Sequence, residues 1–192
     1  MMLPDIIPAI LPTTPEDLES QARALPAEIT HFHLDVLDLP GGGDIWAPFK
    51  QDFEAHLMVE NPAAIVARWV ERGAKRLIVH KIDSEILKYR DKVEIGLAFE
   101  LDVAIKDVLV LAELSDFVHV MSISEIGAQG HPLDTRVFDR IKAVQEKFPD
   151  LPISVDGGVT AQNYERLIEA GADRLVVGSH FKEIWENLQK KS

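Results

Sequence analysis

Short runs of apolar residues, many of them β-branched, alternate along the chain with stretches in which apolar positions recur every three to four residues. The first pattern is typical of strands that are buried on both faces, and the second is typical of helices with one apolar face. Eight runs qualify as strands, and helical pattern separates most of them. They are residues 6–11, 32–37, 53–59, 76–80, 95–99, 117–123, 153–156 and 175–177.

Sequence signals mark where several helices begin and end. At 14–17 the order Thr, Pro, Glu, Asp supplies an N-cap, a proline at the first helical position and an early acid. Asn61-Pro62 predicts the start of a long helix that ends before Gly73. Two more helices are predicted over 161–170, ended by a glycine, and over 134–148, ended by a proline.

A seven-residue segment occurs twice, as GAKRLIV at 73–79 and as GADRLVV at 171–177. Both copies predict a helix end, a tight turn and a buried strand, so they support a repeated unit. Eight β/α units predict an α/β fold, a closed (β/α)8 TIM barrel in a single domain over 1–192. An open flavodoxin-like sheet is the alternative, although it normally has fewer strands. The chain is short for a barrel, and its glycine-rich stretch at 40–52 leaves room for only a shortened second helix.

Composition narrows the possible classes. With 192 residues, 46% of them apolar, the chain can bury a core as one domain. It has no cysteine, so disulfides and cysteine metal sites are excluded. A net charge of −12 argues against nucleic acid or an anionic membrane as a partner, but a small phosphate ester needs only local donors. The start has no basic segment and no apolar run reaches membrane-spanning length, so a cytoplasmic location is expected.

Ionisable side chains stand within three of the predicted strands. His33 and Asp35 share one face of a strand because side chains alternate along it, while His56 and Asp156 lie late in two others. Burying such groups costs free energy unless they are paired. Each such residue alone is more often a hydrogen-bonded core residue or a capping residue. In a parallel barrel, however, all strands end at one rim, so these side chains are expected to lie together. Two imidazoles and two carboxylates there suit one divalent metal ion, with room left for substrate.

The motifs, in order, resemble the ribulose-phosphate 3-epimerase family almost from end to end. Each fragment alone is modest, whereas the ordered set is specific. The fragments are PAIL at 8–11, HLDVLD at 33–38, HLMVENP at 56–62, VHVMSI at 118–123 with Gly-Ala-Gln at 127–129, DGGVTAQN at 156–163 and AGADRLVVGSHF at 170–181.

The resemblance implies a metal-dependent isomerase of carbohydrate metabolism, in the pentose phosphate pathway. It implies one divalent ion, Zn, Fe(II), Mn or Co, bound by His33, Asp35, His56 and Asp156. Asp35 and Asp156 are implied as the acid/base pair that converts D-ribulose 5-phosphate to D-xylulose 5-phosphate through an enediolate. Self-association is implied as well. The expected substrate and phosphate contacts are Gly157, Gly158, Gly178, Ser179, Met58, Met121, Gly127 and Gln129.

Some positions depart from the family pattern. Ala9 stands where a serine is usual, Glu100-Leu101-Asp102 replaces an Asn-Pro turn, and the loop segments at 39–43 and 124–126 are altered. These changes keep two alternatives open: a barrel enzyme acting on another phosphosugar, such as a hexulose-6-phosphate epimerase or synthase, and a non-catalytic metal- and phosphate-binding barrel. Retention of both aspartates favours catalysis.

The remaining histidines lie outside this implied ligand set. His80 ends the fourth predicted strand, which leaves open whether it lines the site. His119 occupies an apolar position of the sixth strand, which favours a hydrogen-bonded core histidine over a ligand. His131 and His180 are expected to be exposed. The loop at 127–130 is expected to close over the substrate.

Overall fold

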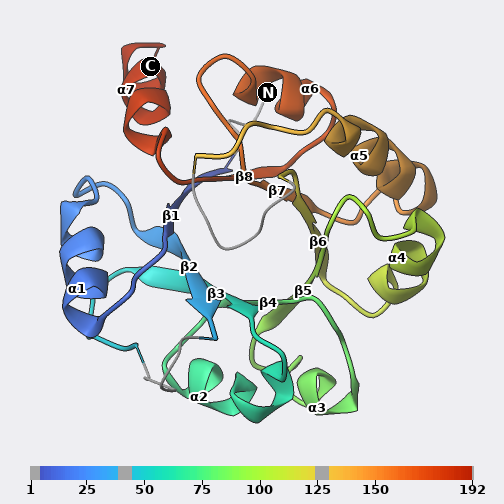
Figure 1. The fold of residues 1–192 in the computed structure, drawn as a ribbon, viewed down its shortest axis with the longest axis horizontal. Helices are drawn as coiled ribbons and strands as arrows, with labels where there is room; N and C mark the ends of the chain where they lie inside the picture. Colours follow the sequence, from blue (N-terminus) through green and yellow to red (C-terminus); the bar gives the residue numbers. More distant parts are fainter. Residues whose placement is uncertain (1–4, 39–44, 124–129, 192) are drawn as a thin grey trace.

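A computed structural model describes residues 5–38, 45–123 and 130–191 of the chain. Eight parallel strands close into a barrel in chain order, with β1 paired to both β2 and β8 (Figure 1). The predicted TIM barrel is confirmed, and each predicted strand ends within two residues of an observed one. The strands are β1 (Asp5–Ile10), β2 (His31–Leu37), β3 (Asp52–Met58), β4 (Arg76–Val79), β5 (Glu94–Phe99), β6 (Phe117–Met121), β7 (Ile153–Asp156) and β8 (Arg174–Val177).

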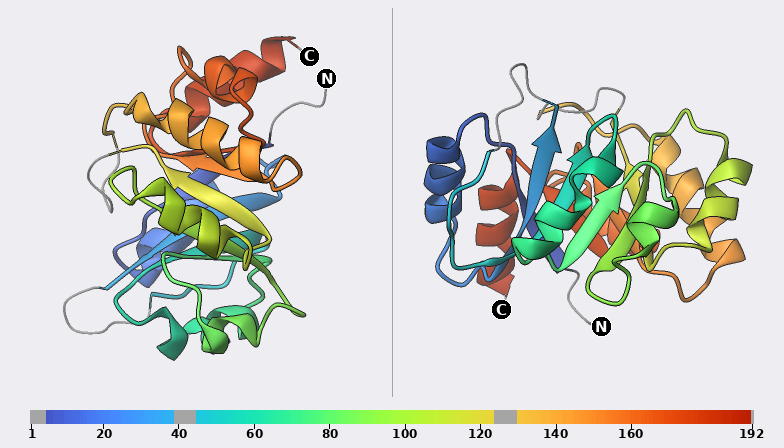
Figure 2. Two further views of the ribbon diagram at one scale, coloured as in Figure 1. Left: turned by 90° about the vertical axis from the view of Figure 1, so that its right-hand side faces the viewer. Right: turned by 90° about the horizontal axis from the view of Figure 1, so that it is seen from below.

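Helices cover the outside of the barrel in every view (Figures 1 and 2). Their apolar faces pack against the outward side chains of the strands, which places most of the buried hydrophobic residues between the two layers. No helix in the described ranges is long and apolar enough to cross a membrane. The helices are α1 (Pro15–Ala24), a 3-10 turn η1 (Pro62–Ala64), α2 (Val66–Glu71), α3 (Ser84–Leu87), α4 (Ile105–Ala112), α5 (Arg136–Lys147), α6 (Tyr164–Glu169) and α7 (Phe181–Lys191).

The predicted start of α1 is confirmed, since Thr14 Oγ1 accepts a hydrogen bond from the Asp17 backbone N–H at 3.1 Å. The single long helix predicted from Asn61-Pro62 is wrong. Ile65, with φ −121° and ψ −10°, separates the 3-10 turn η1 from α2, and Asn61 makes no side-chain capping bond.

The helix predicted over 161–170 begins later than expected, at Tyr164. The Asn163 side chain accepts from the Thr160 backbone N–H at 2.8 Å and donates to the Gly158 carbonyl at 2.8 Å. These bonds hold the preceding segment as a turn, so the helix starts only after Asn163.

The connection between β2 and β3 has no helix at residues 45–51, and residues 39–44 lie outside the described ranges. An aromatic cluster packs on the outside of β3 instead: Trp46 lies 5.7 Å from Phe53 and 5.9 Å from Trp69, ring centre to ring centre. Phe49 lies 5.2 Å from Phe53 in an edge-on arrangement. The cluster therefore covers the part of the barrel that a full second helix would cover.

The interior of the barrel is more polar than its outer layer. The buried polar side chains of the described strands include His33, Glu54, His56, His119 and Ser154. Register explains their proximity, because β2 pairs with β3 so that His33 lies opposite Glu54. The same register sets Asp35 opposite His56. A row of ionisable groups thus runs along the barrel axis towards the end where the strands finish.

Candidate metal and substrate site

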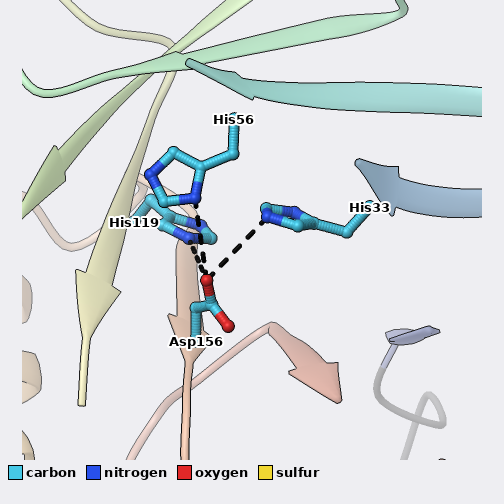
Figure 3. Close-up of side chains that lie close together, drawn as sticks. All are labelled: His33, His56, His119 and Asp156. Atoms are coloured by element: carbon cyan, nitrogen blue, oxygen red, sulfur yellow. Dashed lines mark hydrogen bonds and ion pairs between the residues drawn. The ribbon is translucent and has the colours of Figure 1, made fainter. Parts of the chain in front are cut away.

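Side chains from four strands converge inside the barrel near the carboxyl ends of the strands. Figure 3 shows His33, His56 and His119 turned towards Asp156, from β2, β3, β6 and β7. The three imidazoles are fully buried, and the Asp156 side chain is 14% exposed. Buried imidazoles beside a partly exposed carboxylate are what a site needs when it must hold an ion and also admit a substrate.

The structure brings together the four residues expected from the sequence. His33 Nε2 lies 3.2 Å from Asp35 Oδ1 and 3.8 Å from Asp156 Oδ2. His56 Nδ1 lies 3.4 Å from the same Asp35 oxygen and 3.7 Å from the same Asp156 oxygen. One nitrogen of each imidazole therefore faces both carboxylates.

The second nitrogen of each of these imidazoles has a partner on the far side of its ring. His33 Nδ1 lies 2.7 Å from Glu54 Oε1, and His56 Nε2 lies 3.0 Å from His80 Nε2. His80 Nδ1 in turn lies 3.0 Å from Glu100 Oε1. His80 thus stands beside the site, which the sequence left open. Metal-bound histidines show this division, with one nitrogen on the ion and the other held by an outer partner.

The residues present fit a divalent metal ion. Within the described ranges, the buried His56 Nδ1 has no hydrogen-bond partner, although it points at the two carboxylates. An orphaned buried nitrogen costs free energy, and a bound cation removes that cost. Ligand atoms of His33, His56, His119 and Asp156 all lie within 4.8 Å of one another, close enough to share one ion.

Electrostatics favour the protonation states that metal ligands require at Asp35 and His56, whereas a metal ion would have to displace a proton from His33. Burial acts to raise the pKa of Asp35, but the hydrogen bond with His33 and the close approach of the His56 imidazole hold that pKa below its ordinary value. Burial lowers the pKa of His56 to about 4, with repulsion from neighbouring imidazoles adding to the effect. For His33, burial acts to lower the pKa, but hydrogen bonds to Asp35 and Glu54 raise it well above the usual range. Negative charge thus surrounds His33 and attracts a cation.

Glu54 is an anchor beneath the site. Its carboxylate is 1% exposed and bonds His33 on one side and Arg76 Nη1, at 3.1 Å, on the other. Burial acts to raise the pKa of Glu54, but hydrogen bonds from two histidines hold it well below its ordinary value. The sequence reading missed Glu54, although its position two residues before His56 gives it the same face of β3.

An open cavity adjoins the cluster. Asp35 and Asp156 face it, and Ala9 lines it where a serine hydroxyl was expected from the resemblance. Gly127 and Gln129, with most of the loop expected to close over the substrate, lie outside the described ranges. The other expected substrate and phosphate contacts line the cavity: Met58, Met121, Gly157, Gly158, Gly178 and Ser179.

The glycine turn after β7 has a conformation that other residues rarely adopt. Gly157 and Gly158 have φ of +104° and +64°. A Cβ on Gly158 would lie 2.4 Å from the backbone nitrogen of Leu133, so the turn also packs too tightly for a side chain. His131 and His180 also line the cavity. His180 is exposed as expected, whereas His131 is half-buried, which corrects the prediction for that residue.

His119 is the residue whose place differs most from expectation. It is a buried, hydrogen-bonded histidine as the sequence favoured, with Nδ1 3.2 Å from Ser154 Oγ. Its other nitrogen, Nε2, faces the site and lies 3.2 Å from Asp156 Oδ2. Strand alternation could have indicated this position, because His119 lies on the same face of β6 as Met121, which was expected to contact substrate.

Comparisons with known proteins agree with the motifs. A profile of the ribulose-phosphate 3 epimerase family matches residues 5–182. A ribulose-phosphate 3-epimerase of Chlamydia trachomatis is 31% identical over 174 residues, which cover 79% of this chain and 74% of that protein. One from Eremothecium gossypii is 28% identical over 207 residues, covering 93% and 86%. The tryptophan synthase A-subunit of Pyrococcus furiosus has a TM-score of 0.67 at 14% identity, covering 96% and 92%, a likeness of fold alone.

Proposed function

The chain belongs to the ribulose-phosphate 3-epimerase family, and on that premise we propose that it interconverts D-ribulose 5-phosphate and D-xylulose 5-phosphate. The observation that carries the proposal is the pair Asp35 and Asp156, which reach the same nitrogen of His33 and the same nitrogen of His56 at the floor of one cavity. A binding protein has no need of two such carboxylates.

The reaction needs a proton removed from one face of the carbon beside the ketone and a proton returned to the other face. We assign these steps to Asp35 and Asp156, one acting as base while the other acts as acid. Reversal of the reaction exchanges their roles. The proton returned to the second face comes from the other aspartate. Both carboxylates are partly exposed, so each can exchange its proton with water between turnovers, and the returned proton then comes from solvent.

We assign the metal ligands to His33, Asp35, His56 and Asp156. When a divalent ion is bound, it supplies positive charge that favours the enediolate form of the substrate. Glu54 and Arg76 orient His33, and His80 orients His56, so the ligand nitrogens are held in place from outside. The ion is Zn, Fe(II), Mn or Co on the chemistry of these ligands.

We assign the phosphate group to the part of the cavity lined by the turns at Gly157-Gly158 and Gly178-Ser179. Backbone N–H groups of these turns would be the donors, and α7 begins just beyond at Phe181. A helix N-terminus favours a dianion. Met58 and Met121 also line the cavity, and we assign them to contacts with the carbon chain of the sugar.

Two broader properties stay predictions. We place the protein in the cytoplasm and expect it to associate with itself, both from the sequence and from the resemblance to the family. Ala9 in the cavity wall keeps a different phosphosugar as the alternative substrate, because a missing hydroxyl enlarges the site and removes one polar contact.

The test is proton NMR of ribulose 5-phosphate incubated with the protein in deuterated water. We expect xylulose 5-phosphate to form with deuterium at the inverted carbon, and a chelator to stop the reaction. Hexulose 6-phosphate should react more slowly under the same conditions. Conversion of the hexulose phosphate alone would replace the proposed substrate, and no conversion of either sugar by the metal-loaded protein would refute an epimerase.

A further inference from the structure

β6 carries an imidazole into the barrel where the neighbouring strand leaves space for it. His119 pairs in register with Ala98 on one side and with Ser154 on the other. Ala98 is a small residue, 1% exposed, so the ring can lie inward without a clash. Full burial of an imidazole at this position costs free energy unless both of its nitrogens have partners.

Each nitrogen of His119 has a different environment. Nδ1 lies 3.2 Å from Ser154 Oγ, a hydroxyl that can accept its proton as a hydrogen bond. In that tautomer Nε2 carries a lone pair and points towards Asp156 Oδ2, 3.2 Å away. A lone pair facing a carboxylate oxygen at this distance is unfavourable unless a cation lies between them or beside them.

The same arrangement holds for the other two imidazoles. His119 lies 4.9 Å from His56 and 5.3 Å from His33, ring centre to ring centre, and its ring is stacked within 6° of the His33 plane. His33 and His56 also use their outward nitrogens on other partners. Three inward nitrogens and one carboxylate oxygen therefore converge on one small volume (Figure 3).

The spacing of these atoms suits direct binding to one ion. Metal–nitrogen bonds of about 2.0–2.1 Å place neighbouring ligand atoms roughly 3–4 Å apart around one ion. Distances from Asp156 Oδ2 to the inward nitrogens of His119, His56 and His33 are 3.2, 3.7 and 3.8 Å. The His119 nitrogen is the nearest of the three to the carboxylate that the proposed function already places on the ion.

We propose that His119 Nε2 binds the metal ion directly, as a third imidazole beside His33 and His56. This inference rests on the metal-dependent function proposed above and extends its ligand set. A centre with three imidazoles is richer in nitrogen than one with two imidazoles and two carboxylates. It therefore favours Zn, Fe(II) or Co over the harder Mn and Mg.

The test is X-ray absorption spectroscopy of the zinc-loaded protein, because scattering from imidazole rings counts the histidines bound to the metal. We expect three in the native protein and two in His119→Leu, which restores an apolar side chain to this strand position. Zinc affinity, measured by competition with a chromophoric chelator, should fall at least tenfold in His119→Leu. That bound follows because losing even an outer partner of a ligand costs about 10–100-fold. His180→Leu, which removes a histidine from the cavity wall away from the cluster, should keep three imidazoles and native affinity.

Two imidazoles in the native protein, with His119→Leu binding zinc as tightly as native, would overturn the inference and leave the epimerase proposal standing. In that case His119 is only a hydrogen-bond partner of Asp156. The native spectrum needs no variant, so the result does not depend on whether His119→Leu folds. Native protein that takes up no zinc, cobalt or iron would contradict this inference and the metal-dependent function together.

Discussion

His56 Nε2 and His80 Nε2 lie 3.0 Å apart, so one of these nitrogens must carry the proton that joins them. Glu100 favours one arrangement. Its carboxylate makes an ion-pair contact with His80 Nδ1 at 3.0 Å and can only accept, so it favours a proton on His80 Nδ1, which makes His80 Nε2 the acceptor. His56 then donates from Nε2 and leaves Nδ1 bare towards Asp35. The half-exposed Glu100 thus favours one tautomer of the buried His56, and His80 lies between them.

Glu100→Gln should weaken metal binding by about 10–100-fold, the usual effect of losing an outer partner of a ligand. The amide can donate to His80 Nδ1 and so permits the opposite tautomer along the chain. The measurement is competitive metal titration of the apoprotein. Asp102→Asn is the matched control, since it removes one negative charge from the same loop without touching His80 and should bind metal as the native protein does. Equal affinity in Glu100→Gln and Asp102→Asn would show that Glu100 does not set the tautomer.

The sequence predicted the barrel well because its strands are short, nearly continuous apolar runs. Amphipathic helices instead show apolar residues at every third or fourth position. It predicted α1 well because Thr14 gives a side-chain cap. It failed at the start of α2, where the break at Ile65 follows from a local backbone conformation with no sequence signal that we can identify.

The candidate site was predictable as far as it depends on which face of a strand a side chain occupies and on the edge at which all the strands end. His33, Asp35, His56 and Asp156 follow from strand parity and from the common edge of parallel strands. The sequence did not predict His119 as part of the site, because a single histidine between two valines is more typical of a core residue. Its role depends on the pairing of β6 with β7, which sets it opposite Ser154 and beside Asp156, and that register cannot be read from β6 alone.

Gly178→Val should weaken binding of the phosphorylated sugar at least about tenfold while leaving metal content unchanged. Gly178 lines the cavity at the end assigned to phosphate, and a branched side chain there would block donors to the dianion. Loss of one hydrogen bond to a charged group costs about 1.5–3 kcal/mol, which corresponds to that factor or more. Isothermal titration calorimetry with ribulose 5-phosphate measures the effect.

Unphosphorylated ribulose is the companion ligand for that titration, and native protein should bind it poorly. The net charge of −12 repels a dianion at long range, so tight binding of the phosphate ester requires short, aimed donors. Equal affinity for the two sugars would mean that the phosphate site is elsewhere or absent.

Asp17 should make a pH-dependent contribution to folding stability. Its carboxylate accepts from Gln21 Nε2 and from the Thr13 backbone N–H, both at 2.9 Å, and these hydrogen bonds lower its pKa, with the Gln21 bond the larger cause. Because the folded pKa lies below the unfolded value of about 3.9, the contribution is complete above that pH and is lost as the pH falls through the folded pKa.

Asp17→Asn should therefore lower the free energy of unfolding at pH 7 by an amount under about 1 kcal/mol, since the group is exposed. The difference from native protein should shrink towards zero as the pH falls below about 4. Urea unfolding at a series of pH values measures it. Glu16→Gln, which removes the same charge from the same turn without these hydrogen bonds, should show a smaller effect, and a pH-independent loss in Asp17→Asn would contradict the account.

The most direct test of the central claim separates the two aspartates by the face of the substrate that each serves. Asp35→Asn and Asp156→Asn, each first shown to hold its metal, are incubated in deuterated water with ribulose 5-phosphate and, separately, with xylulose 5-phosphate. Interconversion should fall at least about 100-fold in both variants, the usual worth of a general acid or base. Each variant should still exchange the carbon-bound proton of one epimer, and the two variants should differ in which epimer that is. Near-native interconversion in either variant, or exchange of the same epimer by both, would contradict the two-aspartate mechanism.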